Sequence, residues 1–461
     1  MASYRWMAVC NKRESPAKVW REMDESPSLQ AGSPASKNVV LVSIDSLRAD
    51  HCGYLGSEYD LTPTLDALAA EGIAFENAVA PGPQTFSSMP DAFTGQYRPP
   101  EEADDGSGWQ RRLGLIDSHL DRHPTLPERL QELGYETAAI TPNPWTSEAA
   151  GFDRGFDQFR DLSGADGGGR LDRVVEALPG IDGDDRRLKL LWNLLTGSSF
   201  FNRWESIYNH FQLLRARLSE PYFIWVFLLD THYPFITGRT HRDEQSLRGM
   251  YLSSYRSEAA MRGNAETMSP AVRESLQRSY RDTVRAVDGF LAKLWRDVAA
   301  DDPAVIVHSD HGESFGEHGN YGHHHRQLYE ENIHVPYVVA NAGCQARIGT
   351  PTTLASLPEL ALDVATSGAV DPRRVTAPRV LSTNVSGTVR AVRQRRYKFI
   401  QDGSERLFDL ERDPNEQTDV STAVPEELRA SREYLDRHDG HIRELSQLSD
   451  AAATLEPEVP L

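Results

Sequence analysis

The chain has 461 residues, of which 39% are hydrophobic and 25% are charged, and this composition is that of a globular protein rather than a disordered one. The formal net charge of -19 at pH 7 makes the average surface repel nucleic acid and anionic lipid, so we expect neither nucleic acid nor a membrane as a partner. The longest apolar stretch, residues 222–229, is far shorter than the ~20 residues that span a bilayer, and no transmembrane helix is predicted.

The first residues and the cysteines indicate the compartment. The N-terminal segment MASYRWMAVCNKRESPAK has only a brief apolar patch, which Arg5 and then Lys12 interrupt, so it lacks the apolar core of a secretory signal. We therefore expect a cytoplasmic location. Three scattered cysteines are too few for a disulfide framework or a thiolate metal site, and we interpret them as inert thiols.

The N-terminal half alternates between strand and helix patterns. Residues 1–37 are polar and rich in Ser, Pro and Gly near their end, which predicts a loosely held tail. The segment NVVLVSID, residues 38–45, is a short continuous apolar run typical of a strand buried in a parallel sheet. The patterns that follow predict a helix from Pro63 to Gly72, a strand over 73–80, a helix after Ser87, a helix over 125–133 and a strand over 137–141.

The middle of the chain changes character and then returns to the same alternation. Residues from about 162 to 220 are rich in Gly and Asp before a helical stretch, and we interpret them as an insertion or lid. A strand over 222–230 follows, and then apolar residues at helical spacing predict a long amphipathic helix over 271–299 that leads into a strand over 304–310. The alternation predicts an α/β fold, with a doubly wound, mainly parallel sheet in a catalytic domain over 38–345.

The C-terminal part has a mixed pattern. After Pro336 the sequence predicts a strand over 336–340, a helix over 353–366, and strands near 379–383 and 388–400. We expect a smaller α+β subdomain over 346–425, followed by a charged helix and tail over 426–461.

Two predicted strands end in acidic residues. The strand that begins at Asn38 ends at Asp45, and the strand over 304–310 ends at Asp310 with His311 next to it. Open α/β sheets place their sites at the carboxyl ends of parallel strands, so these side chains are expected to converge. Two converging carboxylates repel each other unless a cation neutralises them, and oxygen ligands with one imidazole suit Ca²⁺, Mg²⁺ or Mn²⁺, with Zn²⁺ also possible. The alternative is that each Asp merely caps a turn.

Five sequence blocks then reveal a family resemblance. The segments IDSLRADHCGYLG, TPTLDALAAEGIAFENAVA, SDHGESFGEHG, LYEENIHVPYVV and RYKFI with LFDLERDPNEQTD come in one order between Asp45 and Asp419. They resemble the successive signature blocks of the sulfatase branch of the alkaline phosphatase superfamily. The resemblance implies the fold that the alternation of strands and helices predicts independently.

The resemblance identifies Thr85 as the candidate nucleophile. Family members place this residue nine positions before a Thr-Gly pair, which here is Thr94-Gly95. Sulfatases need Cys, or occasionally Ser, at that place to form the aldehyde formylglycine, and Thr cannot supply it, so we expect no formylglycine. Two further family positions also differ, with Ser87 in place of Pro and Met89 in place of a basic residue. A plain helix-capping role for Thr85 stays open, and Ser87 and Ser88 are the rival nucleophiles.

The same comparison implies the other site residues. One divalent metal would be held by Asp45, Thr85, Asp310 and His311, since Ser46 stands where many members have a second Asp. His232, at the end of a buried strand, resembles the family His that acts on the leaving oxygen, although a structural role is the alternative. One or two of the histidines in the run His323, His324 and His325 would contact the anionic group of the substrate, and the register within the run stays open.

These residues predict a metal-dependent hydrolase of sulfate or phosphate esters, in which Thr85 attacks sulfur or phosphorus in a small anionic ester. The alternatives are a phosphodiesterase or phosphonate hydrolase, a phosphotransferase of the same superfamily, and a catalytically silent anion-binding protein. The sequence does not indicate the alcohol half of the substrate or the oligomeric state.

Overall fold

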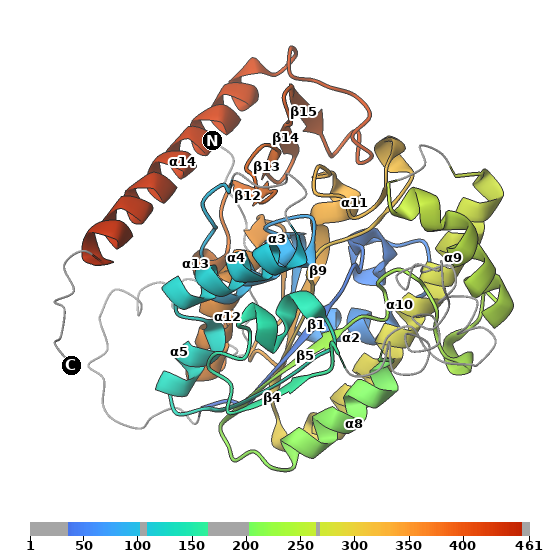
Figure 1. Ribbon diagram of the computed structural model, residues 1–461, viewed down its shortest axis with the longest axis vertical. Helices are drawn as coiled ribbons and strands as arrows, with labels where there is room; N and C mark the ends of the chain where they lie inside the picture. The colour runs from blue at the N-terminus through green and yellow to red at the C-terminus, as the bar shows by residue number, and fades with distance from the viewer. Residues whose placement is uncertain (1–35, 102–107, 165–201, 264–267, 454–461) are drawn as a thin grey trace, which may run out of the picture.

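The computed structural model describes residues 36–101, 108–164, 202–263 and 268–453 (Figure 1). Its centre is a nine-stranded sheet, in which β9 runs antiparallel to both of its neighbours and the other strand pairs are parallel. This confirms the predicted doubly wound, mainly parallel sheet. The strands in spatial order are β10 (Ala346–Ile348), β2 (Ile73–Val79), β9 (His334–Ala340), β6 (Ala304–Ser309), β1 (Val39–Ile44), β5 (Tyr222–Leu228), β3 (Glu136–Thr141) and β4 (Gln158–Asp161), and β11 (Thr352–Thr353) pairs with β2.

The central strands are apolar throughout because both faces of the sheet are covered. All six residues of β1 are buried, and alternate residues point to opposite faces. Val40 and Val42 contact one hydrophobic cluster, whereas Val39 and Leu41 contact the other. The sheet therefore separates two hydrophobic cores.

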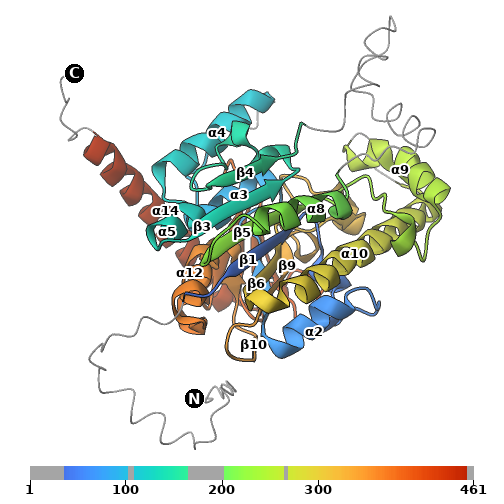
Figure 2. The same ribbon diagram turned by 90° about the horizontal axis from the view of Figure 1, so that it is seen from below.

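Helices form a layer on each face of the sheet (Figure 2). One layer contains α3 (Thr85–Thr94), α4 (Trp109–Arg122), α5 (Leu126–Glu132) and α12 (Leu357–Ser367). The other contains α2 (Pro63–Glu71), α8 (Trp204–Arg215) and α10 (Pro270–Val298), with α9 (Leu247–Met261) packed on α10. Two short helices, α11 (Glu330–Ile333) and α13 (Pro372–Val375), and the two-stranded sheet of β7 (Ser314–Phe315) and β8 (Tyr321–Gly322) lie in the connections.

Most predicted helices and strands occur close to their expected bounds, but three details differ. The helix expected after Ser87 begins at Thr85, because the side chains of Gln84 and Ser87 form a reciprocal cap that starts it earlier. The helices α4 and α9 were not predicted from the sequence. The expected strand over 388–400 is two strands, β13 (Arg390–Arg393) and β14 (Tyr397–Gln401).

A smaller antiparallel sheet follows the main one and contains β12 (Val380–Thr383), β13, β14 and β15 (Glu405–Asp409). The long helix α14 (Pro425–Ala453) lies along its outer side (Figure 1). The stretch of chain that connects β9 to β12 still belongs to the main sheet. Its strands β10 and β11 pair with β2, and its helix α12 contributes to a core of that sheet. The main sheet therefore extends past residue 345, where the sequence placed the domain boundary, and the small sheet begins at Val380.

The expected insertion over 162–220 divides into two parts. Residues 165–201 lie outside the described residues, as do residues 1–35 of the expected tail. The remainder contains α8, which packs Ile207 and Phe211 into the core, so this part is a regular layer of the fold. No helix within the described ranges has an apolar stretch long enough to cross a membrane.

Candidate active site

The predicted acidic residues meet at one edge of the main sheet. Asp45 follows β1 and Asp310 follows β6, and the last residues of these neighbouring parallel strands, Ile44 and Ser309, stand side by side in the register. Both carboxyl groups are completely buried, as is His311. The strand ends thus converge at the position expected for a doubly wound sheet.

Thr85 joins this cluster from the first turn of α3. Its Oγ1 donates a hydrogen bond of 2.7 Å to Oδ2 of Asp310 and lies 3.4 Å from Oδ2 of Asp45. The Nε2 atom of His311 is 3.3 Å from the same hydroxyl. The rival nucleophiles have other surroundings, because Ser87 takes part in the helix cap and the buried Ser88 hydroxyl has no hydrogen-bond partner among the described residues.

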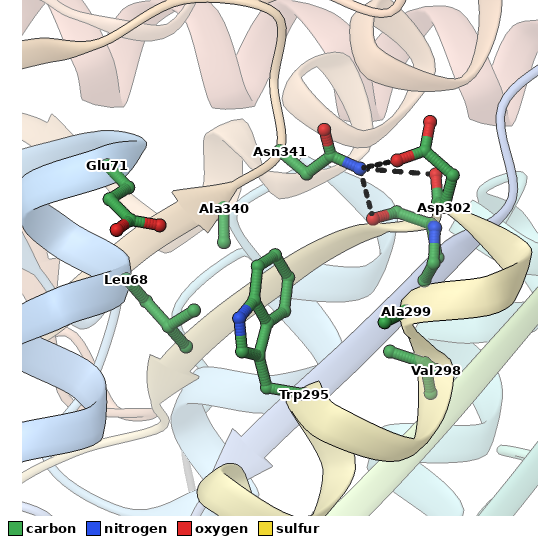
Figure 3. A pocket seen from close by; sticks show the side chains of 9 residues that line it. Leu68, Glu71, Trp295, Val298, Ala299, Asp302, Ala340 and Asn341 are labelled. Atoms are coloured by element: carbon green, nitrogen blue, oxygen red, sulfur yellow. Dashed lines mark hydrogen bonds between the residues drawn. The ribbon is translucent and has the colours of Figure 1, made fainter.

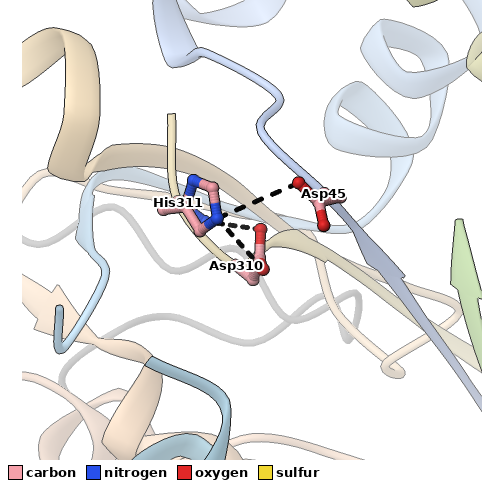
Figure 4. A group of neighbouring side chains, drawn as sticks. All are labelled: Asp45, Asp310 and His311. Carbon is pink, nitrogen blue, oxygen red and sulfur yellow. Dashed lines mark hydrogen bonds and ion pairs between the residues drawn. The ribbon is translucent and has the colours of Figure 1, made fainter. Parts of the chain in front are cut away.

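The donor set fits a divalent cation. Ligand atoms of Asp45, Asp310 and His311 all lie within 4.8 Å of one another (Figure 4). His311 Nδ1 donates to the carbonyl oxygen of Gly312 at 2.8 Å, which leaves the lone pair of Nε2 facing the carboxylates. Two carboxylates with one neutral imidazole suit an ion such as Mg²⁺, Mn²⁺ or Ca²⁺.

The electrostatics of the cluster favour binding of a cation. Burial raises the pKa of Asp310 well above its ordinary range, and repulsion from the Asp45 carboxylate raises it further. Burial also lowers the pKa of His311 to about 3, with a further contribution from His323. A bound cation would let both carboxylates stay ionised and would use His311 in its neutral form.

Asn143 is part of the site, although the sequence analysis did not identify it. Its Nδ2 donates to Oδ2 of Asp45 at 2.9 Å and reaches Oγ1 of Thr85 at 3.4 Å. Its Oδ1 accepts from the backbone N–H of Trp145 at 2.9 Å, which fixes the amide orientation. Asn143 comes two residues after β3 ends, so the strand-end rule that identified Asp45 could have found it.

Ser46 supports the carboxylates through an unusual backbone conformation. Its φ is 59°, in the left-handed region that non-glycine residues rarely adopt. In this conformation the Ser46 N–H donates to Oδ1 of Asp310 at 3.2 Å, and its hydroxyl donates to Oδ1 of Asp45 at 2.8 Å. The strained residue thus links the two acidic groups.

Two of the predicted histidines lie next to the cluster. The ring of His323 is 4.6 Å from that of His311 and 5.3 Å from that of His232, measured between centroids. Nδ1 of His323 is 3.2 Å from Oε1 of Glu313, a completely buried carboxylate that the sequence analysis missed. Desolvation lowers the pKa of His323, but the carboxylates of Glu313, Asp45 and Asp310 together raise it by more, to about 9. Nδ1 of His232 lies 2.6 Å from the carbonyl oxygen of Tyr233.

The structure separates the three histidines of the run. His323 lines a cavity of about 190 Å³ beside Thr85, together with His232. His325 lines a small neighbouring cavity. His324 is exposed, and its ring lies near Gly263, so it belongs to neither cavity. The side chains around the larger of these two cavities are Gln84, Thr85, Phe86, Trp109, Arg112, Asn143, Pro144, Trp145, Leu229, His232 and His323.

A wider cavity of about 300 Å³ lies at the opposite end of the sheet, with the indole of Trp295 at its centre (Figure 3). Pro303 and Ala340 line it, at the start of β6 and the end of β9. None of the predicted site residues belongs to it. Among the described cavities, the one beside Thr85 is therefore the candidate active site.

Comparisons with known proteins identify the family of the chain. The model of the family described as Sulfatase matches residues 37–365. A protein of Trinickia caryophylli called multifunctional alkaline phosphatase superfamily protein PehA is 24% identical over 382 residues, which cover 68% of this chain and 70% of the relative. An ulvan-active sulfatase of Formosa agariphila is 23% identical over 355 residues, which cover 71% of this chain but 62% of the relative. The crystal structure of a phosphonate monoester hydrolase of Agrobacterium radiobacter has a similar fold, with a TM-score of 0.58 and 16% identity over 89% of this chain and 96% of that one.

Proposed function

The chain belongs to the sulfatase family and is an ester hydrolase of that type, and on this premise we propose that it uses Thr85 as its nucleophile and prefers phosphate or phosphonate esters to sulfate esters. The observation that carries the proposal is the position of the Thr85 hydroxyl, which is hydrogen-bonded to Asp310 and close to both Asp45 and His311. One divalent cation would be held by Asp45, Asp310, His311 and Thr85. When bound, it would neutralise the oxygens of the transferred group and lower the pKa of the Thr85 hydroxyl.

Thr85 would attack the phosphorus atom from the first turn of α3. The positive end of the helix dipole and the first N–H groups of the helix favour an anionic group at this place. Asn143, which donates toward Thr85 and Asp45, would hold the hydroxyl in position. The Thr85 hydroxyl would first lose its proton to solvent. The bond between Thr85 Oγ1 and phosphorus would then form as the bond from phosphorus to the alcohol oxygen breaks, and water would later hydrolyse the threonyl ester.

The departing alcohol needs a proton, and we assign its supply to His232. It lines the cavity beside Thr85, with Nδ1 2.6 Å from the carbonyl oxygen of Tyr233, and Nε2 would transfer the proton. His323, paired with Glu313, would bind the anionic oxygens as a cation. The two histidines therefore take the different roles of acid and anion binder.

The identity of the nucleophile supports the substrate preference. A formylglycine hydrate sheds sulfate by elimination, and Thr85 cannot form that aldehyde. A threonyl ester must be hydrolysed by water instead, and a threonyl phosphate is more readily attacked at phosphorus than a threonyl sulfate is at sulfur. A phosphoester or phosphonate ester is therefore the substrate class that suits this site.

The test is to locate the covalent intermediate. Thr85→Ala should lose at least about 10³-fold in kcat while keeping its circular dichroism spectrum, since a nucleophile is removed. Rapid acid quench of the native enzyme with an aryl phosphate, phosphodiester or phosphonate should trap added mass on the peptide that contains Thr85. Near-native turnover of Thr85→Ala, or an adduct on Ser87 or Ser88, would refute the nucleophile. Efficient hydrolysis of aryl sulfates alone would refute the substrate preference.

A further inference from the structure

The turn that follows β1 is held by a hydroxyl group from a distant helix. Tyr280 lies on α10, and its hydroxyl donates a hydrogen bond of 2.7 Å to the carbonyl oxygen of Ser46. The same hydroxyl accepts a hydrogen bond of 2.9 Å from the backbone N–H of Arg48. All three residues are buried. One side chain therefore satisfies two backbone groups that would be costly to leave unpaired in the interior.

The position of the Tyr280 hydroxyl is set by the hydrophobic core. The ring is completely buried, and its centroid lies 5.1 Å from that of Phe235 and 5.0 Å from that of Phe315. These rings belong to the core that packs α10 against the main sheet. Tyr280 lines none of the described cavities. The core therefore fixes where the hydroxyl lies, and the hydroxyl holds the turn over 46–48 from behind the site.

This turn carries the residue that links the two carboxylates of the site. Ser46 has a φ of 59°, a conformation that a non-glycine residue keeps only where the surrounding structure holds it. In that conformation its N–H and its hydroxyl reach Oδ1 of Asp310 and Oδ1 of Asp45, respectively. The bonds of the Tyr280 hydroxyl fix the Ser46 carbonyl and the N–H two residues later. The backbone of Ser46 is thus held in the form that serves both carboxylates.

The bonds from Ser46 also orient the two carboxylates. Ser46 bonds to Oδ1 of each, whereas Oδ2 of Asp310 and Oδ2 of Asp45 lie 2.7 Å and 3.4 Å from Oγ1 of Thr85. One oxygen of each carboxylate is therefore tied to the turn, and the other faces the nucleophile. A shift of the turn would rotate both carboxylates away from that arrangement.

We propose that Tyr280 is a positioning residue of the metal site, which acts through Ser46 to orient the carboxylates of Asp45 and Asp310 toward the cation. This inference rests on the proposed function, since that proposal assigns both carboxylates to the metal. Loss of a hydrogen-bond partner behind a metal ligand typically weakens metal binding by about 10- to 100-fold. Affinity for the cation is therefore the property that the Tyr280 hydroxyl should govern.

The test measures metal affinity rather than turnover. Calorimetric titration of the metal-free full chain with Mn²⁺ would compare the native protein with Tyr280→Phe, which keeps the ring and removes only the hydroxyl. The dissociation constant for Mn²⁺ should be about 10- to 100-fold higher in Tyr280→Phe. Circular dichroism would establish that the variant is folded.

Tyr135→Phe is the matched control. Tyr135 is also buried, and its hydroxyl lies 2.8 Å and 2.9 Å from the carbonyl oxygens of Lys37 and Ala365. Lys37 precedes β1 and Tyr135 precedes β3, so this hydroxyl lies at the end of the sheet opposite to the site. Its loss should leave the dissociation constant for Mn²⁺ unchanged. A general loss of stability would affect both variants alike, whereas a positioning role weakens Mn²⁺ binding in Tyr280→Phe alone.

A second variant tests the route through Ser46. Ser46→Ala removes the hydrogen bond to Oδ1 of Asp45, and it should also weaken Mn²⁺ binding, by about tenfold. The double variant should lose less affinity than the product of the two single losses, because the Tyr280 hydroxyl then has fewer bonds to hold in place. If Tyr280→Phe does not fold, Ser46→Ala still decides, since native affinity for Mn²⁺ in that variant would overturn the proposal.

The outcomes distinguish this inference from the proposed function. Native affinity for Mn²⁺ in Tyr280→Phe, or a loss that Tyr135→Phe shares, would overturn the positioning role while the metal site stands. Single losses that multiply in the double variant would overturn the route through Ser46. A native protein that binds neither Mn²⁺ nor Mg²⁺ would refute the metal site, and this inference with it. If Tyr280→Phe weakens Mn²⁺ binding but the native protein hydrolyses no ester, the positioning role stands and the proposed reaction fails.

Discussion

At the scale of single residues, the site depends on side chains that never need to touch the substrate. Ser46 and Asn143 each donate a hydrogen bond to Asp45, and Glu313 engages His323 from a completely buried position. Partners of this kind fix the orientation and charge of the groups to which we assign the chemistry. Their loss should therefore alter the reaction while leaving the fold intact.

Glu313→Gln tests this for the His323 pair. The amide keeps a polar group near Nδ1 but removes the negative charge that raises the pKa of His323, so that pKa should fall. If the cationic form binds the substrate, kcat/KM should drop by about 10- to 100-fold at neutral pH, and its alkaline limb should move to lower pH. The measurement is a pH profile of kcat/KM.

Glu331→Gln is the matched control for that variant. Glu331 pairs with His318 at 3.0 Å, and neither residue lines the cavity beside Thr85. The same chemical change there should leave both the rate and the profile as in the native enzyme. A Glu313→Gln protein with a native pH profile would contradict the role given to the pair.

The sequence predicted some of these residues and missed others for physical reasons. Asp45, Asp310 and His311 follow continuous apolar strands, and such strands end at a shared edge. Asn143 obeys the same rule but follows a shorter apolar run. Glu313 carries no local signal, because its significance comes from His323, ten residues along in an irregular loop. The register of His323 among its neighbours likewise depends on how that loop turns.

At the scale of elements, the two sheets are joined through a buried charged cluster. Lys398 on β14 is completely buried, and its Nζ lies 3.1 Å from Glu330 and 2.9 Å from Glu416. Arg393 on β13 also pairs with Glu330. Burial raises the pKa of Glu416 to about 7 even though Lys398 lowers it. This cluster fixes the small sheet against α11 without contributing to the site.

Lys398→Met should therefore reduce stability and spare the chemistry. Removing the ammonium leaves two buried carboxylates with less compensation, and breaking a buried pair in this way costs about 3–5 kcal/mol. Chemical denaturation should show that loss, while turnover per folded molecule stays native. Lys293→Met removes a lysine from a surface pair on α10 and should change little. Native stability of Lys398→Met, or collapsed turnover in a folded sample, would contradict this account.

Element prediction succeeded where the sequence pattern was long and failed where pairing was distant. The helix α10 has 29 residues and a clear apolar stripe, and its expected bounds differ from the observed ones by one residue at each end. By contrast, β10 and β11 have three and two residues and pair with β2, which is more than 250 residues earlier. So short a run carries no periodicity, and the boundary expected at residue 346 therefore divided the main sheet.

At the scale of the whole molecule, the sheet gathers buried acidic groups at one edge. Asp45 and Asp310 come from neighbouring strands that the hydrophobic cores hold at fixed spacing, so the fold cannot relax to separate them. Burial, and in addition repulsion from Asp45, raises the pKa of Asp310, which means that folding works against this pair unless a cation is present. Stability of the whole chain should therefore depend on metal.

Metal removal tests this coupling. Prolonged treatment with a chelator should lower the melting temperature, and Mn²⁺ or Mg²⁺ at 100 times its dissociation constant should return about 2.7 kcal/mol of stability. Elemental analysis of the restored protein should give close to one metal per chain.

Asp310→Asn should lose the response to metal, yet its metal-free form should melt no lower than the metal-free native protein, because the substitution removes the repelling charge. Asp302→Asn makes the same change beside the remote cavity, at a positive φ that Asn tolerates, and should keep the full response. Two metals per chain would refute the single-ion site. A metal-free Asp310→Asn protein that melts well below metal-free native protein would show that the hydrogen bonds of the Asp310 carboxylate stabilise the fold by more than its repulsion from Asp45 destabilises it.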